Sequence, residues 1–144
     1  MASAKEYLKQ IRSEQIELRA LTEKREETRL SLYPKAITYD GVKVQTSPED
    51  ILSERTAEIC ELDNAIADQI EKLDQRKADA MRTTAKIEDA KSRTLIELYY
   101  LSIRADGKLL RWADVADIMG YNERHIIQYI HPRALRDFSK KMKL

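Results

Sequence analysis

The residues best suited to specific recognition chemistry lie near the C-terminal end of the chain, on a predicted helix that follows Gly120. Arg124 can pair with guanine and Gln128 with adenine, each through two hydrogen bonds. Glu123 can accept a hydrogen bond from cytosine, and Ile127 can contact a thymine methyl group. The residues expected to face outward here are Asn122, Glu123, Arg124, Ile127, Gln128 and His131. Their types predict a helix that reads base edges of double-stranded DNA, against the simpler alternative of a solvated surface.

Basic residues around this helix are suited to the phosphate backbone. They are Lys108, Arg111, Arg133, Arg136, Lys140 and Lys141. A lysine-rich terminus alone is often only solvated, but the charge of the surrounding segment supports the prediction. Residues 91–144 carry a net charge of +5 and residues 1–90 a net charge of −4, although the whole chain sums to +1. The near-neutral total therefore does not exclude a nucleic-acid partner, because charge is unevenly distributed.

The element that must position these side chains is a helix-turn-helix. Residues 112–119 are predicted to form the first helix, in which Ala116 is small enough for a close helix crossing. Gly120 permits the backbone to leave that helix with positive φ, and Asn122 can cap the next helix. Val115, Met119, Ile126 and either Tyr129 or Ile130 are expected to close the core. A helical hairpin without a DNA role is the alternative.

The front of the chain predicts two long helices. Residues 4–32 contain no Gly or Pro, and a second helix is expected from Ser47-Pro48, a typical helix start. Their apolar residues recur at spacings of three and four, which predicts an antiparallel, coiled-coil-like hairpin. Asp40-Gly41 between alternating β-forming residues predicts a β-hairpin over residues 36–45. The second helix is expected to break near residues 88–91, and residues 105–108 to form a turn. We therefore expect an all-α fold with an assembly region at 1–90 and a DNA-binding domain at 91–144.

Several other classes of function are disfavoured by composition. The single cysteine, Cys60, cannot form an internal disulfide and is expected to lie buried or half-buried beside the helical seam. No Cys/His set suits zinc, and His125 and His131 lack the neighbours of a catalytic or metal pair. We expect no metal, no cofactor and no enzymatic activity. No apolar run approaches the roughly 18–20 residues of a membrane span, so we expect a cytoplasmic protein with no membrane partner.

Five sequence stretches together resemble a known family. They are KEYLKQI at 5–11, VQTSP at 44–48, LIELYY at 95–100, WADVADIMGY at 112–121 and RAL at 133–135. The set resembles the phage and prophage regulators of Gram-positive bacteria grouped with the ArpU and RinA late-transcription activators. Their C-terminal part is similar to region 4 of bacterial sigma factors. The resemblance implies a phage-encoded regulator that binds promoter DNA of late or packaging genes in the bacterial host and contacts RNA polymerase.

The chain departs from that family pattern at two places. Asn122 stands where the family has a serine cap, an exchange that preserves capping. The stretch from Asn122 to Ala134 is one residue longer and contains Pro132, which is expected to end or kink the helix because proline has no amide hydrogen.

We expect a transcription regulator that binds DNA as a homo-oligomer, with a dimer favoured because one short helix reads few base pairs. Two alternatives remain at this point. One is a small terminase-like packaging subunit, which would form a ring. The other is a protein-interaction module that does not read DNA directly.

Overall fold

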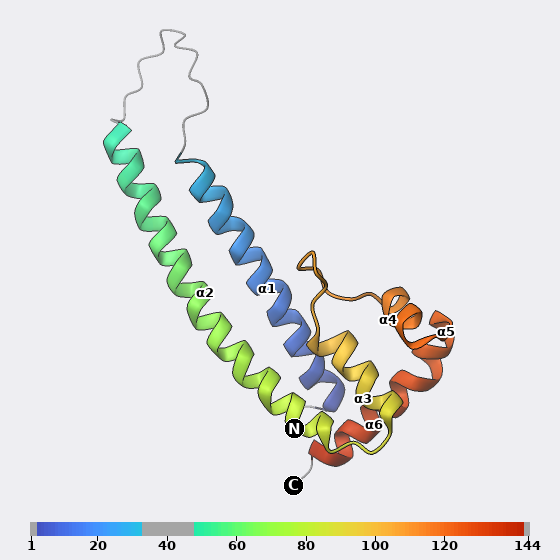
Figure 1. Ribbon diagram of the computed structural model, residues 1–144. Helices are drawn as coiled ribbons and strands as arrows, with labels where there is room; N and C mark the ends of the chain where they lie inside the picture. The colour runs from blue at the N-terminus through green and yellow to red at the C-terminus, as the bar shows by residue number, and fades with distance from the viewer. Residues whose placement is uncertain (1–2, 33–47, 143–144) are drawn as a thin grey trace. The chain divides into compact units, whose positions relative to one another are not determined.

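The computed structural model describes residues 3–32 and 48–142. Its elements, in chain order, are α1 (Ala4–Leu30), α2 (Pro48–Ala85), α3 (Ala90–Ile96), η1 (Glu97–Leu101), α4 (Trp112–Met119), α5 (Glu123–His125), η2 (Ile126–Ile130) and α6 (His131–Met142) (Figure 1). The two η elements are single π-helical turns. Within the described residues no strand is present, so the expected all-α class is confirmed. The predicted β-hairpin at 36–45 lies outside those residues.

The chain divides into two compact units. The first contains residues 1–16 together with 71–144, and the second contains residues 17–70. The predicted boundary at residue 90 rests on charge, and as a functional boundary it stays a prediction. The packing unit is larger, because it also takes in the start of α1 and the end of α2.

The smaller unit pairs the C-terminal part of α1 with the N-terminal part of α2. An ion pair between Arg25 Nε and Asp63 Oδ1, at 2.7 Å, links the two helices. Leu62 is buried there, whereas most of the surrounding residues of α2 are exposed. Cys60 is exposed as well, so the prediction that it is buried or half-buried beside the seam is wrong. The helix turns that cysteine away from the face that carries Leu62.

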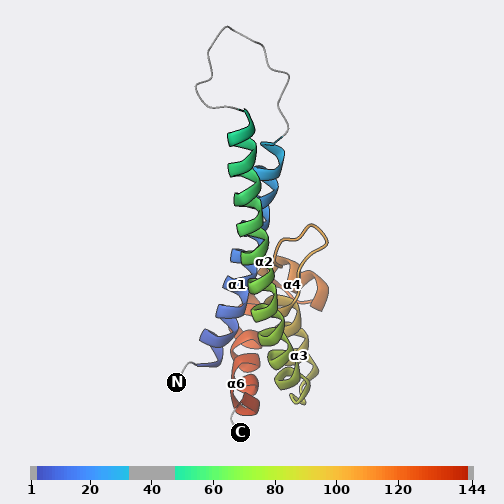
Figure 2. The ribbon, with the colours of Figure 1, turned by 90° about the vertical axis from the view of Figure 1, so that its left-hand side faces the viewer.

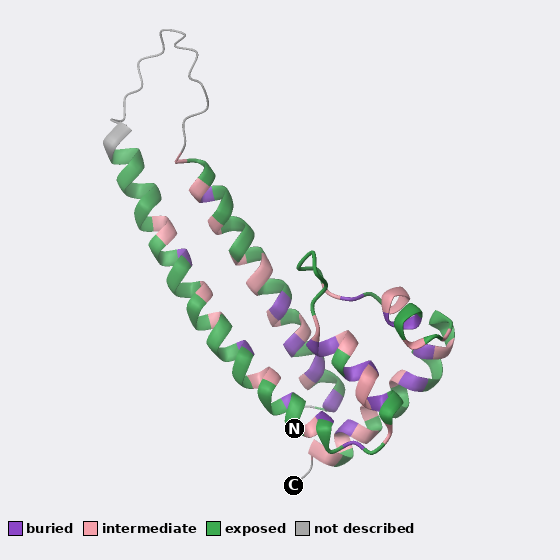
Figure 3. Ribbon diagram, viewed as in Figure 1, coloured by how far each residue is buried: buried purple, intermediate pink, exposed green. Residues whose placement is uncertain are grey.

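The larger unit contains the main hydrophobic core, visible as the buried segments in Figure 3. In it, α3 packs against α6, and the two helices lie side by side in both views (Figure 2). Tyr7 of α1 stacks on Phe138 of α6, with 6.0 Å between ring centroids. The fully buried apolar side chains of this core are Leu8, Ile11, Ile87, Leu95, Ile96, Tyr100, Val115, Ile126 and Phe138. The core therefore draws on both ends of the chain.

The predicted break and turn are both present. α2 ends at Ala85 and α3 begins at Ala90. Farther along, the amide of Arg104 donates to the carbonyl of Lys108 at 2.8 Å, and Gly107 has a φ of +82°. An isolated antiparallel bridge between Ile103 and Leu109 closes this turn.

The chain stays helical at Pro132, so of the two expected outcomes, an end or a kink of the helix, the end is excluded. The residue before it, His131, has helical backbone angles, and its amide donates to the carbonyl of Ile126 five residues back. Pro132 then lies in the first turn of α6, where a missing amide hydrogen costs least. A π turn holds one more residue than an α turn, and η2 is such a turn directly before α6. The helical conformation continues through Pro132 and does not end there.

The same region decides which residue closes the core. Ile130 is 6% exposed and Tyr129 is 64% exposed. Of the two residues left open by the sequence, Ile130 is therefore the core residue. None of the described helices is long and apolar enough to cross a membrane.

Candidate nucleic-acid interface

Two short helices are held at a fixed angle by the turn at Gly120. The amides of Gly120 and Tyr121 both donate to the carbonyl of Ala116, at 2.9 and 3.1 Å. Gly120 has a φ of +79°, which side chains other than glycine rarely adopt. Beyond the turn, Asn122 Oδ1 accepts a hydrogen bond from the amide of His125 at 2.7 Å, as expected of a helix cap. The local sequence thus determines where α5 begins.

The face presented by α5 and η2 contains four of the predicted base-reading residues. Glu123, Arg124, Ile127 and Gln128 are all exposed and line one shallow depression. Glu123 and Arg124 lie one helical turn before Ile127 and Gln128, so the four form a contiguous patch, which we call the reading face. The fifth predicted residue, Asn122, is exposed, but its side-chain oxygen is occupied by the capping hydrogen bond.

His131 does not belong to the reading face. Its Nε2 lies 2.6 Å from the hydroxyl of Tyr100, and its ring makes an edge contact with Trp112 at 4.6 Å between centroids. Burial, followed by the positive charges of Lys5 and Lys9, lowers the pKa of His131 to about 4. The sequence predicts an outward-facing His131, but its half-buried ring packs against Tyr99 and Tyr100 of η1 and Trp112 of α4.

The six predicted phosphate-contacting residues are spread over three segments. Lys108, Arg111, Arg133, Arg136 and Lys140 are exposed, and Lys141 is half-buried. Arg111 Nε lies 3.4 Å from Asp114 Oδ2 at the start of α4. None of the six is among the residues that line the depression of the reading face.

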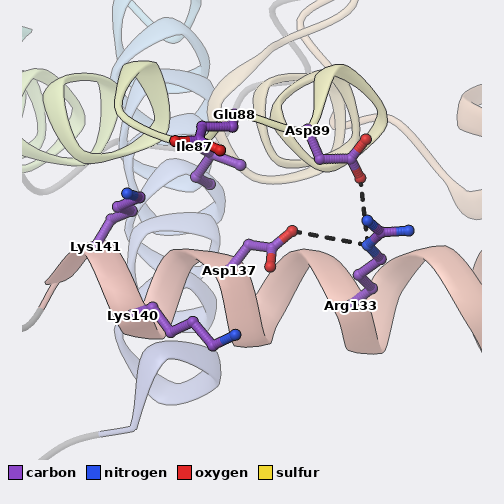
Figure 4. A pocket seen from close by; sticks show the side chains of 7 residues that line it. All are labelled: Ile87, Glu88, Asp89, Arg133, Asp137, Lys140 and Lys141. Atoms are coloured by element: carbon purple, nitrogen blue, oxygen red, sulfur yellow. Dashed lines mark ion pairs between the residues drawn. The ribbon is translucent and has the colours of Figure 1, made fainter.

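Arg133 lies in a depression with carboxylates (Figure 4). Its Nε is 3.5 Å from Asp89 Oδ2 and 4.0 Å from Asp137 Oδ2. The hydroxyl of Ser92 is within 3.0 Å of the first and 2.8 Å of the second of these oxygens. Arg133 thus helps to join α3 to α6, and its charge is partly compensated.

Sequence reasoning missed a second group of cations, which comes from α1. Lys5, Lys9 and Arg12 line a groove together with Ile127 and His131. The three cations follow the spacing i, i+4, i+7, which puts them on one side of a helix. That spacing is visible in the sequence, but the partner that this side of α1 would face is not.

Arg12 and Gln15 anchor α1 in this position. The guanidinium of Arg12 donates to the carbonyls of Tyr99 and Leu110, the latter at 2.8 Å. Gln15, which is buried, donates to the carbonyl of Tyr100 at 2.8 Å. These carbonyls at the end of η1 and before α4 would otherwise lack partners. Two polar residues of α1 thereby fix the helix against the C-terminal segment.

Stacked rings continue this anchor toward α4. The guanidinium carbon of Arg12 lies 3.9 Å from the centroid of the Tyr99 ring. Tyr99 in turn stacks on Trp112, with 3.7 Å between centroids and 10° between planes. α4 is therefore held from its N-terminal residue by a stack that begins in α1.

The described residues contain no group of three or more His, Cys, Asp or Glu side chains that could hold a metal ion. Comparisons with protein-family models, with curated proteins and with solved structures found no match to this chain.

Proposed function

We propose that this protein binds double-stranded DNA by inserting the reading face of α5 and η2 into the major groove, and that α4, the Gly120 turn and α5 act as a helix-turn-helix. In this proposal Arg124 and Gln128 read base edges, Glu123 and Ile127 adjust the preference, and the surrounding cations contact phosphates. The protein acts as a transcription regulator of phage origin, a role that rests on the sequence resemblance.

The observation that carries the proposal is the combination of the turn and the exposed patch. A positive-φ glycine and an asparagine cap orient a short helix whose outward side chains are Glu123, Arg124, Ile127 and Gln128. A recognition helix reads bases mainly through residues of its N-terminal half. All four residues lie within the first two turns after the cap, where such contacts are made.

The proposal is tested by selecting duplexes from a random library with the full-length chain and then measuring binding by fluorescence anisotropy. We expect a selected duplex to bind at least 10³-fold more tightly than a scrambled duplex near 0.15 M salt, the lower end of specific recognition. Because paired half-sites are expected for one small reading helix, the selected sequence should contain a repeat.

Single-residue variants distinguish recognition of base edges from general electrostatic attraction to the DNA backbone. Arg124→Ala is expected to lower the preference for the selected duplex by about 10- to 100-fold, corresponding to loss of a bidentate contact worth roughly 1–3 kcal/mol. Arg19→Ala, which removes a half-exposed arginine of α1 outside the reading face, serves as the matched control and should leave the preference unchanged. Equal affinity of the wild type for selected and scrambled duplexes would contradict the proposal.

A further inference from the structure

We infer that the groove between the first part of α1 and η2 holds the DNA backbone next to the bases read by η2, with Lys5 and Lys9 each contacting one phosphate. The inference rests on the proposed function. It assigns DNA contact to the net-acidic part of the sequence, in which no such residue was expected.

Continuity with the reading face supports this assignment. Ile127 lines both the reading face and the groove, so the two depressions meet at one side chain. A duplex that contacts Arg124 and Gln128 would therefore place its backbone beside the groove. Phosphates flank the major groove on both sides, which is the position that Lys5 and Lys9 would then face.

The charge of the groove also favours an anion. Lys5, Lys9 and Arg12 are among its lining residues, and these contain no Asp or Glu. Among the ion pairs of the described residues, none involves Lys5 or Lys9. His131 also lines the groove, and its pKa is lowered by burial first and then by the charges of Lys5 and Lys9.

The depression of Figure 4 offers a useful contrast. It is also rich in cations, but Glu88, Asp89 and Asp137 line it together with Arg133, Lys140 and Lys141. Carboxylates in that position would repel a phosphate. Of the two charged depressions, the α1 groove is therefore the better match to a nucleic-acid backbone.

The groove is rigidly positioned, which matters for a specific contact. Arg12 and Gln15 bind backbone carbonyls of Tyr99, Tyr100 and Leu110, and so hold α1 against the C-terminal segment. Lys9 and Lys5 lie about one and two helical turns, respectively, before Arg12. They are thus presented from a fixed helix, which lowers the entropy lost on binding.

The test compares the full-length wild type with the double variant Lys5→Gln, Lys9→Gln on the selected duplex over a series of salt concentrations. We expect the slope of log affinity against log salt to decrease in magnitude by about 2, since each phosphate contact releases about one counterion. At 0.15 M salt the affinity should fall by roughly 10- to 30-fold. The ratio of affinities for selected and scrambled duplexes should stay the same, because phosphate contacts carry no sequence information.

The matched control is Lys24→Gln, Lys72→Gln, which removes two exposed lysines of α1 and α2 outside the groove. Circular dichroism melts of each variant check that folding is retained.

If the groove variant keeps the wild-type salt slope while Arg124→Ala loses sequence preference, the proposed function stands and this inference is overturned. If the wild type itself shows no duplex preference, both fall. If the groove variant binds DNA like the wild type but binds poly-glutamate more weakly, the inference is overturned in favour of an acidic polypeptide partner.

Discussion

At the scale of single residues, His131 shows how burial can redirect a polar side chain. Its ring is enclosed by Tyr100, Tyr99 and Trp112, and its Nε2 shares a hydrogen bond with the Tyr100 hydroxyl. The neutral ring suits this position, since the cations Lys5 and Lys9 are nearby. A charged imidazolium there would lose hydration and face repulsion.

This environment predicts a specific dependence of stability on pH. The folded-state pKa of His131 is about 4, below the ordinary value of 6.5. Between these two values the unfolded chain binds a proton that the folded chain does not, so the free energy of unfolding falls as pH decreases from 6.5 toward 4. Because the ring is partly exposed to solvent, we expect a loss of about 1 kcal/mol between pH 7 and pH 5.

Urea denaturation at pH 7 and pH 5 measures this loss. His131→Gln retains a polar group but cannot titrate. Its free energy of unfolding should therefore fall by about 1 kcal/mol less than that of the wild type between pH 7 and pH 5. The lower absolute stability of the variant does not affect this comparison. An identical pH dependence in the two proteins would show that His131 is not responsible.

At the scale of elements, the contact between α1 and the end of η1 depends on the shape of one guanidinium group. Arg12 bridges two backbone carbonyls and lies over the Tyr99 ring. A lysine at this position has a single ammonium group, which cannot reproduce the planar fork or the stacking.

We therefore expect Arg12→Lys to lower the free energy of unfolding by about 1–3 kcal/mol, the cost of leaving a part-buried carbonyl without a partner. Arg19→Lys on the same helix should change it by less than about 0.5 kcal/mol, because exposed substitutions are usually mild. Chemical denaturation monitored by circular dichroism at 222 nm compares them. Equal losses in the two variants would mean that the bridge contributes nothing particular.

Local patterns predicted most of the elements. The helix at 112–119, the Gly120 turn and the Asn122 cap each depend on a few adjacent residues, and all three are present. The outward direction of Arg124 and Gln128 follows from the same short register. These features were predictable because glycine and capping residues act over one turn of chain.

Features that depend on distant partners were not predictable in this way. The half-buried position of His131 depends on Tyr100 and Trp112, and Gln15 is buried where it binds a carbonyl 85 residues away in sequence. The pattern of residues 1–16 shows a polar residue interrupting an apolar stripe, but it does not show what that residue binds. The groove that contains Lys5 and Lys9 went unrecognised for the same reason.

At the scale of the whole molecule, the charge boundary and the packing boundary fall at different places. Charge changes sign near residue 90, whereas the larger compact unit joins residues 1–16 with 71–144. Leu8 and Ile11, from the acidic part of the sequence, are fully buried in that unit. The basic segment therefore depends on the start of the chain for part of its core.

This dependence predicts the behaviour of fragments. Residues 91–144 alone would expose the surfaces that Leu8, Ile11 and Ile87 cover, each a buried side chain worth roughly 1.5–3 kcal/mol. We expect this fragment to melt without cooperativity or well below the full chain in circular dichroism. A chain in which a short Gly/Ser linker joins residue 16 to residue 71 should melt cooperatively, since it keeps the whole unit. A 91–144 fragment that melts like the intact protein would contradict this expectation.

Trp112 has a consequence for how binding can be observed. It is the only tryptophan of the chain, and it is stacked on Tyr99 beside His131. Its intrinsic fluorescence therefore originates at the junction of α1, η1 and α4. Trp112 also lines the groove that contains Lys5 and Lys9. A duplex backbone bound in that groove would change the emission of this one indole, whereas a duplex confined to the reading face would leave it almost constant. The unlabelled protein thus carries its own optical reporter of whether the groove is occupied.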